Sequence, residues 1–159
     1  MEEHDSFCSS CHTQPESTYY TRARAGGTPS DLATFHHTKQ ARCIECHSGQ
    51  GLTGRANAIM MGAHNALAWF TGTATQPASL TIPISDENCL KCHTDVLTRG
   101  GFNNHYHELL PRWQAMDPQA ASCVTCHTTH ATDGDPKLGF LNQVKTEQVC
   151  QMCHNQLAE

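Results

Sequence analysis

The pattern C-x-x-C-H occurs five times in this 159-residue chain and uses all ten of its cysteines. Two thiols at this spacing can add to the two vinyl groups of one porphyrin, and the adjacent histidine can then coordinate the iron. The thiol pairs are Cys8 and Cys11, Cys43 and Cys46, Cys89 and Cys92, Cys123 and Cys126, and Cys150 and Cys153, followed by the proximal histidines His12, His47, His93, His127 and His154. The sequence therefore predicts five covalently bound haem c groups.

Zinc sites, disulfides and thioredoxin-like redox pairs are the alternatives for cysteines at this spacing. Zinc ribbons and redox pairs place no constraint on the residue after the second cysteine. In this chain a histidine follows the second cysteine in every copy, and no cysteine is left over. Haem attachment is therefore the favoured interpretation.

The hydrophobic content of the chain limits the core that the polypeptide alone can form. Leu, Ile, Val and Phe together make up 24 of the 159 residues, and a share of about 15% is typical of disordered chains. At roughly 32 residues per haem, the porphyrins must supply the missing apolar surface, so folding should depend on haem. We expect one domain over residues 1–159, mainly α with long loops, cored by haem and with very little β structure.

Charge and hydropathy argue against nucleic-acid binding and against a membrane span. The formal net charge is -5 and haem propionates add to it, so we expect no nucleic-acid binding. An apolar run of about 18 residues is absent, so we expect no membrane span in this chain. Covalent haem attachment takes place outside the cytoplasm, so we expect a periplasmic or extracellular protein whose targeting segment has been removed or omitted.

Breakers and apolar spacing predict short helices between loops. The expected elements are a loop over 13–31, a short helix capped by Asp31, a break at Gly49, Gly51 and Gly54, a helix over 55–70, a helix start at 85–87, a helix that ends near Pro111 or beyond, a turn over 133–136 and a last helix from about Thr146.

Seven histidines lie outside the motifs and are candidates for the second axial position of an iron. They are His4, His36, His37, His64, His105, His107 and His130. Five irons need at most five of them, so every iron can be bis-histidine at low potential and none needs to stay open for a substrate.

Two of these candidates sit in informative helical patterns. His64 lies on the apolar face of the helix over 55–70, between Met60 and Leu67. A single histidine on such a face is more often a hydrogen-bonded core residue, but a face that must meet a porphyrin favours a ligand. His36 and His37 point different ways on a helix, so they can serve two haems, or one of them can be structural.

The motif spacing contains a weak two-fold repeat. The first motif is followed by another after 35 residues and the third after 34, and each interval contains paired histidines, His36 and His37 in one and His105 and His107 in the other.

From Phe7 to His130, about three quarters of its length, the chain resembles the NapC/NirT family of tetrahaem quinol dehydrogenases. The matching residues are Cys8-x-x-Cys11-His12, His37 before Cys43-Ile44-Glu45-Cys46-His47, Gly62-Ala63-His64 with Ala68-Trp69-Phe70-Thr71-Gly72-Thr73, Glu87-Asn88-Cys89-x-x-Cys92-His93, and Cys123-x-x-Cys126-His127 with His130. The resemblance implies that His37 or His36 ligates the fourth haem, His107 or His105 the third, and His130 the second.

Three features of that family are absent from the chain. We expect no transmembrane anchor in this chain, Thr13-Gln14 stands where the family carries a methionine after the first motif, and Ala58 and Met61 lie near the positions of the family's quinol-site Lys and Asp. A fifth motif is also added. We therefore expect a haem relay that does not oxidise quinols directly.

These features together predict an electron carrier and not an enzyme. We expect a pentahaem cytochrome, similar to small pentahaem partners of periplasmic reductases, whose donor and acceptor are other redox proteins or multihaem cytochromes. The alternative is a subunit of a polymeric extracellular cytochrome filament, in which His4 ligates the haem of a neighbouring copy. A nitrite or hydroxylamine reductase is disfavoured, since pentahaem nitrite reductases use a C-x-x-C-K motif that does not occur here.

Overall fold

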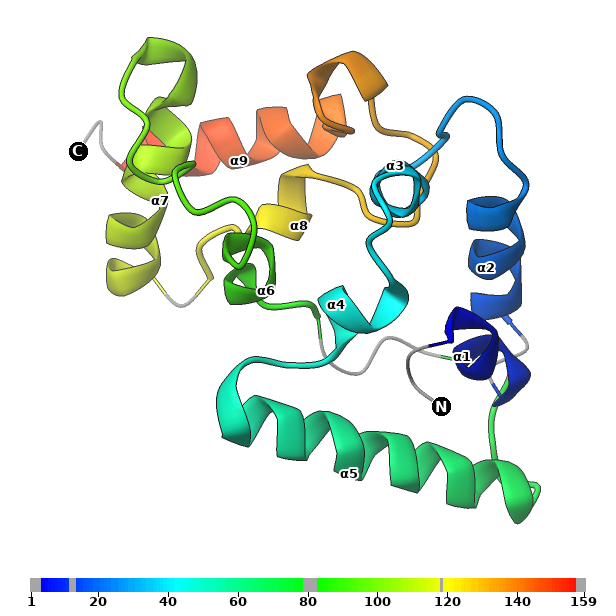
Figure 1. Ribbon diagram of the computed structural model, residues 1–159. Coiled ribbons are helices and arrows are strands. Elements are labelled where there is room, and N and C mark those ends of the chain that lie inside the picture. The colour runs from blue at the N-terminus through cyan, green and yellow to red at the C-terminus, as the bar shows by residue number, and fades with distance from the viewer. Residues whose placement is uncertain (1–3, 12–13, 79–82, 118, 157–159) are drawn as a thin grey trace. The chain divides into compact units, whose positions relative to one another are not determined.

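The computed structural model describes residues 4–11, 14–78, 83–117 and 119–156, and this part of the chain is mainly helical (Figure 1). The elements are α1 (Asp5–Cys11), α2 (Glu16–Arg24), α3 (Leu32–Thr38), α4 (Cys43–His47), α5 (Gly51–Phe70), α6 (Asp86–Leu90), the 3-10 helix η1 (Phe102–Asn104), α7 (His105–Met116), α8 (Cys123–Cys126), the 3-10 helix η2 (Pro136–Leu138) and α9 (Gln143–Gln156). Isolated β-bridges join Leu141 to His127 and to Asp135. The predicted mainly α fold with very little β structure is confirmed.

The chain divides into two compact units, residues 1–84 and 85–159. The first unit contains α1 to α5 and the first two motifs, and the second contains α6 to α9 and the other three. A single domain over residues 1–159 stays a prediction. Within the described residues, no helix is both long enough and apolar enough to cross a bilayer.

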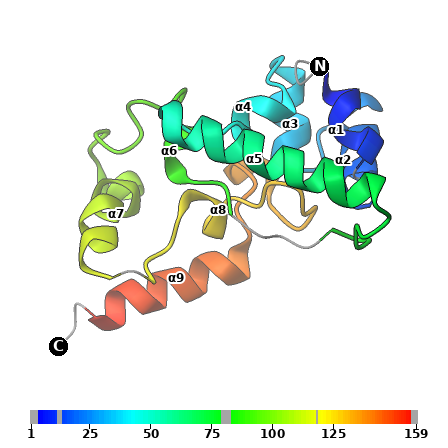
Figure 2. The ribbon, with the colours of Figure 1, turned by 90° about the horizontal axis from the view of Figure 1, so that it is seen from below.

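Helix α2 corrects the loop that we expected over 13–31. Pro15 precedes the first residue of α2, and Gly26 and Gly27, both with positive φ, follow its last turn. Pro is favoured at the start of a helix and Gly just beyond its end. The breakers therefore bound a helix, which packs against α1 and α3 (Figures 1 and 2).

Asp31 begins α3 as predicted. Its side chain is almost fully buried, accepts a hydrogen bond of 2.7 Å from the Thr34 N–H, and pairs with Arg22 of α2. A carboxylate at the N-cap satisfies one of the otherwise unpaired N–H groups of the first turn. Asp31 therefore fixes both the start of α3 and its packing on α2.

Helix α5 begins at Gly51, earlier than the predicted residue 55, so two of the three glycines expected in a break lie inside the helix. Gly49 has a φ of 69°, and a Cβ atom there would lie 2.3 Å from the carbonyl oxygen of Gly54. The chain therefore turns at residue 49 and folds back onto the first turn of α5, an approach that only glycine allows.

In the second unit, the start of one helix agrees with the prediction and the start of another differs from it. Helix α6 starts after Ser85, as predicted, and α7 continues through Pro111 to Met116. Helix α9 begins at Gln143 and not near Thr146, because the Asn142 side chain accepts a hydrogen bond of 2.9 Å from the Lys145 N–H at its start.

The protein core is small, as the composition predicts. Among the described residues, the buried hydrophobic side chains are Trp113, Ala121 and Phe140. Helix α5 contains no buried residue, and Leu52 and Phe70, near its ends, are 91% and 84% exposed. The polypeptide alone therefore leaves much of its apolar surface uncovered.

Candidate functional site

The motifs are held on short helices and on α9. Cys8 lies in α1 and Cys89 in α6, whereas Cys43 and Cys123 are the first residues of α4 and α8. The fifth motif, residues 150–154, lies inside α9. His12 lies outside the described residues, so the structure gives a position for four of the five proximal histidines.

Cysteines of successive motifs lie side by side in each unit. The Cys89 and Cys123 thiols share a hydrogen bond, which lowers the pKa of Cys89 to about 7 and raises the pKa of Cys123. Burial, and then the charge of Asp5, raises the pKa of Cys43 to about 12, with Cys8 close enough to contribute. The first motif is therefore adjacent to the second, and the third to the fourth.

The fourth and fifth motifs are adjacent as well. Burial raises the pKa of the Cys126 thiol, which also has Cys150 nearby, while a hydrogen bond with Thr146 opposes the shift. Helices α8 and α9 lie beside each other in both views (Figures 1 and 2). In the second unit, the third motif is therefore adjacent to the fourth, and the fourth to the fifth.

Two histidines of α7 lie beside proximal histidines. The ring centroids of His107 and His127 are 6.1 Å apart with their planes inclined by 5°, and those of His105 and His154 are 6.4 Å apart with an inclination of 66°. Metal–imidazole nitrogen bonds of about 2 Å place the centres of two rings on opposite sides of one metal roughly 6 Å apart. Both separations therefore fit two imidazoles that share one iron.

Hydrogen bonds at Nδ1 fix the tautomer of several histidines. The Nδ1–acceptor distances are 2.9 Å from His36 to the Leu32 carbonyl, 2.6 Å from His105 to the Phe102 carbonyl, 2.8 Å from His107 to Asn104 Oδ1 and 2.6 Å from His127 to the Gly139 carbonyl. A carbonyl oxygen only accepts, so Nδ1 carries the proton and Nε2 presents its lone pair. This is the state that supporting groups impose on metal-bound histidines.

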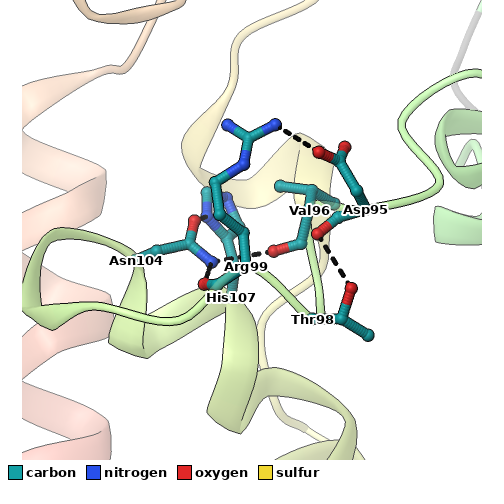
Figure 3. Close-up of polar contacts among 6 residues, drawn as sticks. All are labelled: Asp95, Val96, Thr98, Arg99, Asn104 and His107. Carbon is teal, nitrogen blue, oxygen red and sulfur yellow. Dashed lines mark hydrogen bonds and ion pairs between the residues drawn. The ribbon is translucent and has the colours of Figure 1, made fainter.

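Asn104 is the one side-chain acceptor in this set. Its Nδ2 donates to the carbonyl oxygens of Val96, at 2.8 Å, and Arg99, at 2.6 Å, which leaves Oδ1 to receive the His107 proton (Figure 3). Partial burial lowers the pKa of His107, and the positive charges of His127 and Arg99 add to this shift. The site therefore favours a neutral imidazole, which is the form that binds a metal.

Gly139 supports His127 from the far end of a loop. It has a φ of 64°, and a Cβ atom there would lie 3.4 Å from Cε1 of the His127 ring. Thr128 donates its N–H to the carbonyl of the buried Phe140, at 3.0 Å, and so closes the loop. Glycine at 139 thus allows the backbone carbonyl to reach the imidazole.

In the first unit, the neighbours His36 and His37 face different groups. His36 Nδ1 donates within α3, whereas His37 Nε2 lies 3.9 Å from Asp5 Oδ2. His64 is exposed on α5, between Met60 and Leu67, which are 69% and 63% exposed. The histidine and the apolar side chains around it are thus available to a group that covers this helix.

The histidines differ in how far the protein covers them. His36, His37, His105, His107, His127 and His130 are half-buried, whereas His4, His47, His64, His93 and His154 are exposed. Among the half-buried rings, hydrogen bonds at Nδ1 already hold His36, His105, His107 and His127.

The residues fit covalently bound haem. Motif cysteines of the described residues carry thiols that form no disulfide, among them Cys43, Cys89, Cys92, Cys123, Cys126, Cys150 and Cys153. Imidazoles whose Nδ1 atoms donate to oxygen atoms lie beside these cysteines in the second unit, where large apolar side chains are also exposed. Thioether-forming thiols, nitrogen ligands and uncovered apolar surface together are what a haem c requires.

The supporting residues could not all be identified from the sequence. The sequence does not reveal the roles of Asn104 and Gly139. The only local signal is that each lies in a glycine-containing stretch of the chain. Asp5 and Asp86 were also missed as partners of the motifs. The sequence does contain one signal for these two aspartates: each lies three residues before the first cysteine of a motif, the first motif for Asp5 and the third for Asp86.

A protein-family model described as a doubled CXXCH motif matches residues 117–159, which hold the fourth and fifth motifs. The match indicates a multihaem c-type cytochrome with covalently bound haem c. The matched segment contains α8 and α9, whose motifs lie next to each other. The searches of curated proteins and of solved structures found no match.

Proposed function

We propose that this multihaem cytochrome is an extracytoplasmic electron carrier with five low-potential haems, each bound by two histidines. The observation that carries the proposal is the ring separation of His107 from His127 and of His105 from His154. In both pairs a motif histidine has a second imidazole at the distance expected across one iron. Such an iron has no position left for a substrate, so the geometry favours electron transfer over catalysis.

We assign His107 to the haem of the fourth motif and His105 to the haem of the fifth. The resemblance to the NapC/NirT family implied the third haem for one of them, whereas the ring separations favour these two assignments. Side chains two residues apart on a helix point to different sides. Helix α7 can therefore serve two haems at once.

For the other three irons the second ligand comes from the remaining candidates, His4, His36, His37, His64 and His130. His36 is the best prepared, because its Nδ1 already donates to the Leu32 carbonyl, which is the support that metal-bound histidines receive. The matching residues of the resemblance favour His37 or His36 on the fourth haem, but His107 occupies that place in this proposal. His36 is thus proposed for a haem of the first unit.

The histidine environment sets the redox range. Bound haem c supplies a reversible one-electron iron couple. Hydrogen bonds from Nδ1 to carbonyl oxygens make the imidazoles stronger donors to a metal, and two imidazoles give a lower potential than a histidine and a methionine. The chain therefore favours low potentials, suited to exchange with other low-potential cytochromes.

Stopped-flow mixing tests the proposed partners. Oxidised protein is mixed with a menaquinol analogue in one arm and with a reduced low-potential multihaem cytochrome in the other. Because Ala58 and Met61 lie near the former quinol-site positions, we expect rapid reduction by the cytochrome and little by the quinol. Fast, saturable reduction by the quinol would overturn the carrier proposal and favour quinol dehydrogenation.

A filament subunit is the second candidate. His4 is exposed close to the start of the chain, where it could ligate the haem of a neighbouring copy. Electron microscopy of the matured protein distinguishes the two candidates, because filaments support the subunit and dispersed particles support the carrier.

A further inference from the structure

Asp5 and Asp86 occupy equivalent positions in the two units. Each is the first residue of its helix, α1 or α6, and each lies three residues before the first cysteine of a motif, Cys8 or Cys89. Both aspartates are half-buried. Neither belongs to a haem-binding motif, so their placement needs another explanation.

Both carboxylates bind the start of the next motif. Asp86 Oδ1 accepts a hydrogen bond of 2.7 Å from the Cys123 N–H, and Asp5 Oδ1 accepts one of 3.1 Å from the Cys43 N–H. Cys43 and Cys123 open α4 and α8, where the first N–H groups of a helix have no partner inside it. Each aspartate therefore links the helix of one motif to the first cysteine of the following one.

The second oxygen of each carboxylate faces a helix that lies between the two motifs in the sequence. Asp86 Oδ2 accepts a hydrogen bond of 2.7 Å from Gln114 of α7, and Asp5 Oδ2 lies 3.9 Å from Nε2 of His37 in α3. These intervening helices are the ones that carry the paired histidines, at 36 and 37 and at 105 and 107. Each carboxylate thus joins the helix of one motif, a histidine-bearing helix and the start of the next motif, although α2 is an additional helix in the first unit.

The attachment points of the two motifs meet at each carboxylate. The Cys89 and Cys123 thiols share a hydrogen bond, and Cys8 lies near Cys43. Helix α6 contacts α8, and α1 contacts α4 (Figures 1 and 2). The motif intervals of 35 and 34 residues match as well. Contacts, element order and spacing therefore agree on a repeated unit that the sequence indicated only weakly.

We propose that Asp5 and Asp86 are positioning residues that hold the haems in two close pairs, first with second and third with fourth, in two copies of one di-haem module. The inference rests on the proposed function, because it requires haem at these four motifs. The fifth motif joins the second copy through α9, where Cys150 lies near Cys126. Each aspartate holds the backbone N–H of the first cysteine of the next motif, and its carboxylate also lies against the thiol of that cysteine.

Circular dichroism in the Soret band tests the pairing. Haems held close and at a fixed angle couple their transitions and give a signal with two lobes of opposite sign. We expect Asp5→Ala and Asp86→Ala each to remove the contribution of one pair, and the double variant to remove both. Asp86→Asn should retain the signal, because the amide oxygen still accepts the Cys123 N–H.

Glu87→Ala is the matched control, since it removes the same charge from the exposed neighbour of Asp86. Haem content is measured first in every variant, and fewer than five haems in the parent protein contradicts the proposed function. Five haems with an unchanged Soret signal in Asp86→Ala overturns the pairing alone. If Asp86→Ala does not mature, Asp86→Glu shifts the carboxylate by one methylene, and an unaltered signal in that variant overturns the proposal.

Discussion

Asn104 is the residue whose replacement most selectively tests the ligand environment. Asn104→Ala removes the oxygen that accepts the His107 proton, so the imidazole becomes a weaker donor, and loss of such a partner costs about 10–100-fold in metal-site affinity. We expect the potential of one haem to rise, as measured by a spectroscopic redox titration, while the others stay near their parent values.

Asn103→Ala is the control for this variant, because Asn103 is the exposed neighbour of Asn104. It should leave all haem potentials unchanged. A titration of Asn104→Ala that superimposes on that of the parent protein would contradict the role of the Asn104 oxygen.

The sequence predicts the residues that carry chemistry but not the atoms that support them. A thiol pair followed by a histidine is a recognisable sequence pattern. Asp31 predicted the start of a helix, and the structure confirms that start. The acceptors for His36, His105 and His127 are backbone carbonyls. A carbonyl is common to every residue, so no side-chain pattern can reveal which one faces an imidazole.

At the scale of an element, α7 makes the clearest prediction. If His105 and His107 serve two different irons, each single change to alanine should convert one haem from low-spin to high-spin, and the double change should convert two. The high-spin ferric signal in electron paramagnetic resonance measures this. Tyr106→Phe, between the two histidines, is the control and should stay low-spin.

A double variant with no more high-spin iron than either single variant would show that both histidines act on one haem. That result would contradict the assignment drawn from the ring separations. It would leave the haem count unaffected.

Helix α5 makes a second prediction at this scale. His64→Ala should convert one iron to a high-spin state or to one with an exchangeable ligand, because the apolar face around it offers no replacement imidazole. Asn57→Ala, at an exposed position on the same helix, should change nothing. A fully low-spin spectrum for His64→Ala would mean that His64 is structural.

The start of α3 was predicted well, because the Asp31 side chain caps it, whereas the boundaries near glycine and proline were predicted poorly. Pro15, Gly26 and Gly27 were interpreted as a loop, but they enclose α2, because Pro can begin a helix and Gly can end one. Gly51 and Gly54 lie inside α5, whose start is set by the close approach of Gly49 to Gly54. Such contacts depend on neighbours in space and are not visible in local composition.

At the scale of the whole molecule, the amino-acid composition correctly predicted that the polypeptide has a small hydrophobic core. The buried hydrophobic side chains of the described residues are few, and large ones such as Leu52, Phe70 and Phe102 are 91%, 84% and 86% exposed. Polypeptide contacts alone leave this surface in water at a cost of about 25 cal/mol per Å². Haem attachment is therefore expected to drive folding, as metal binding does in small metal-site domains.

A reductive titration that counts electrons tests the pentahaem carrier most directly. The matured chain is reduced stepwise while the Soret and α bands are recorded. We expect five electrons per 159-residue chain, all taken up at potentials below those of histidine–methionine cytochromes, with low-spin spectra throughout. A capacity of four electrons or fewer, or a high-spin component in fully matured protein, would contradict a carrier with five bis-histidine haems.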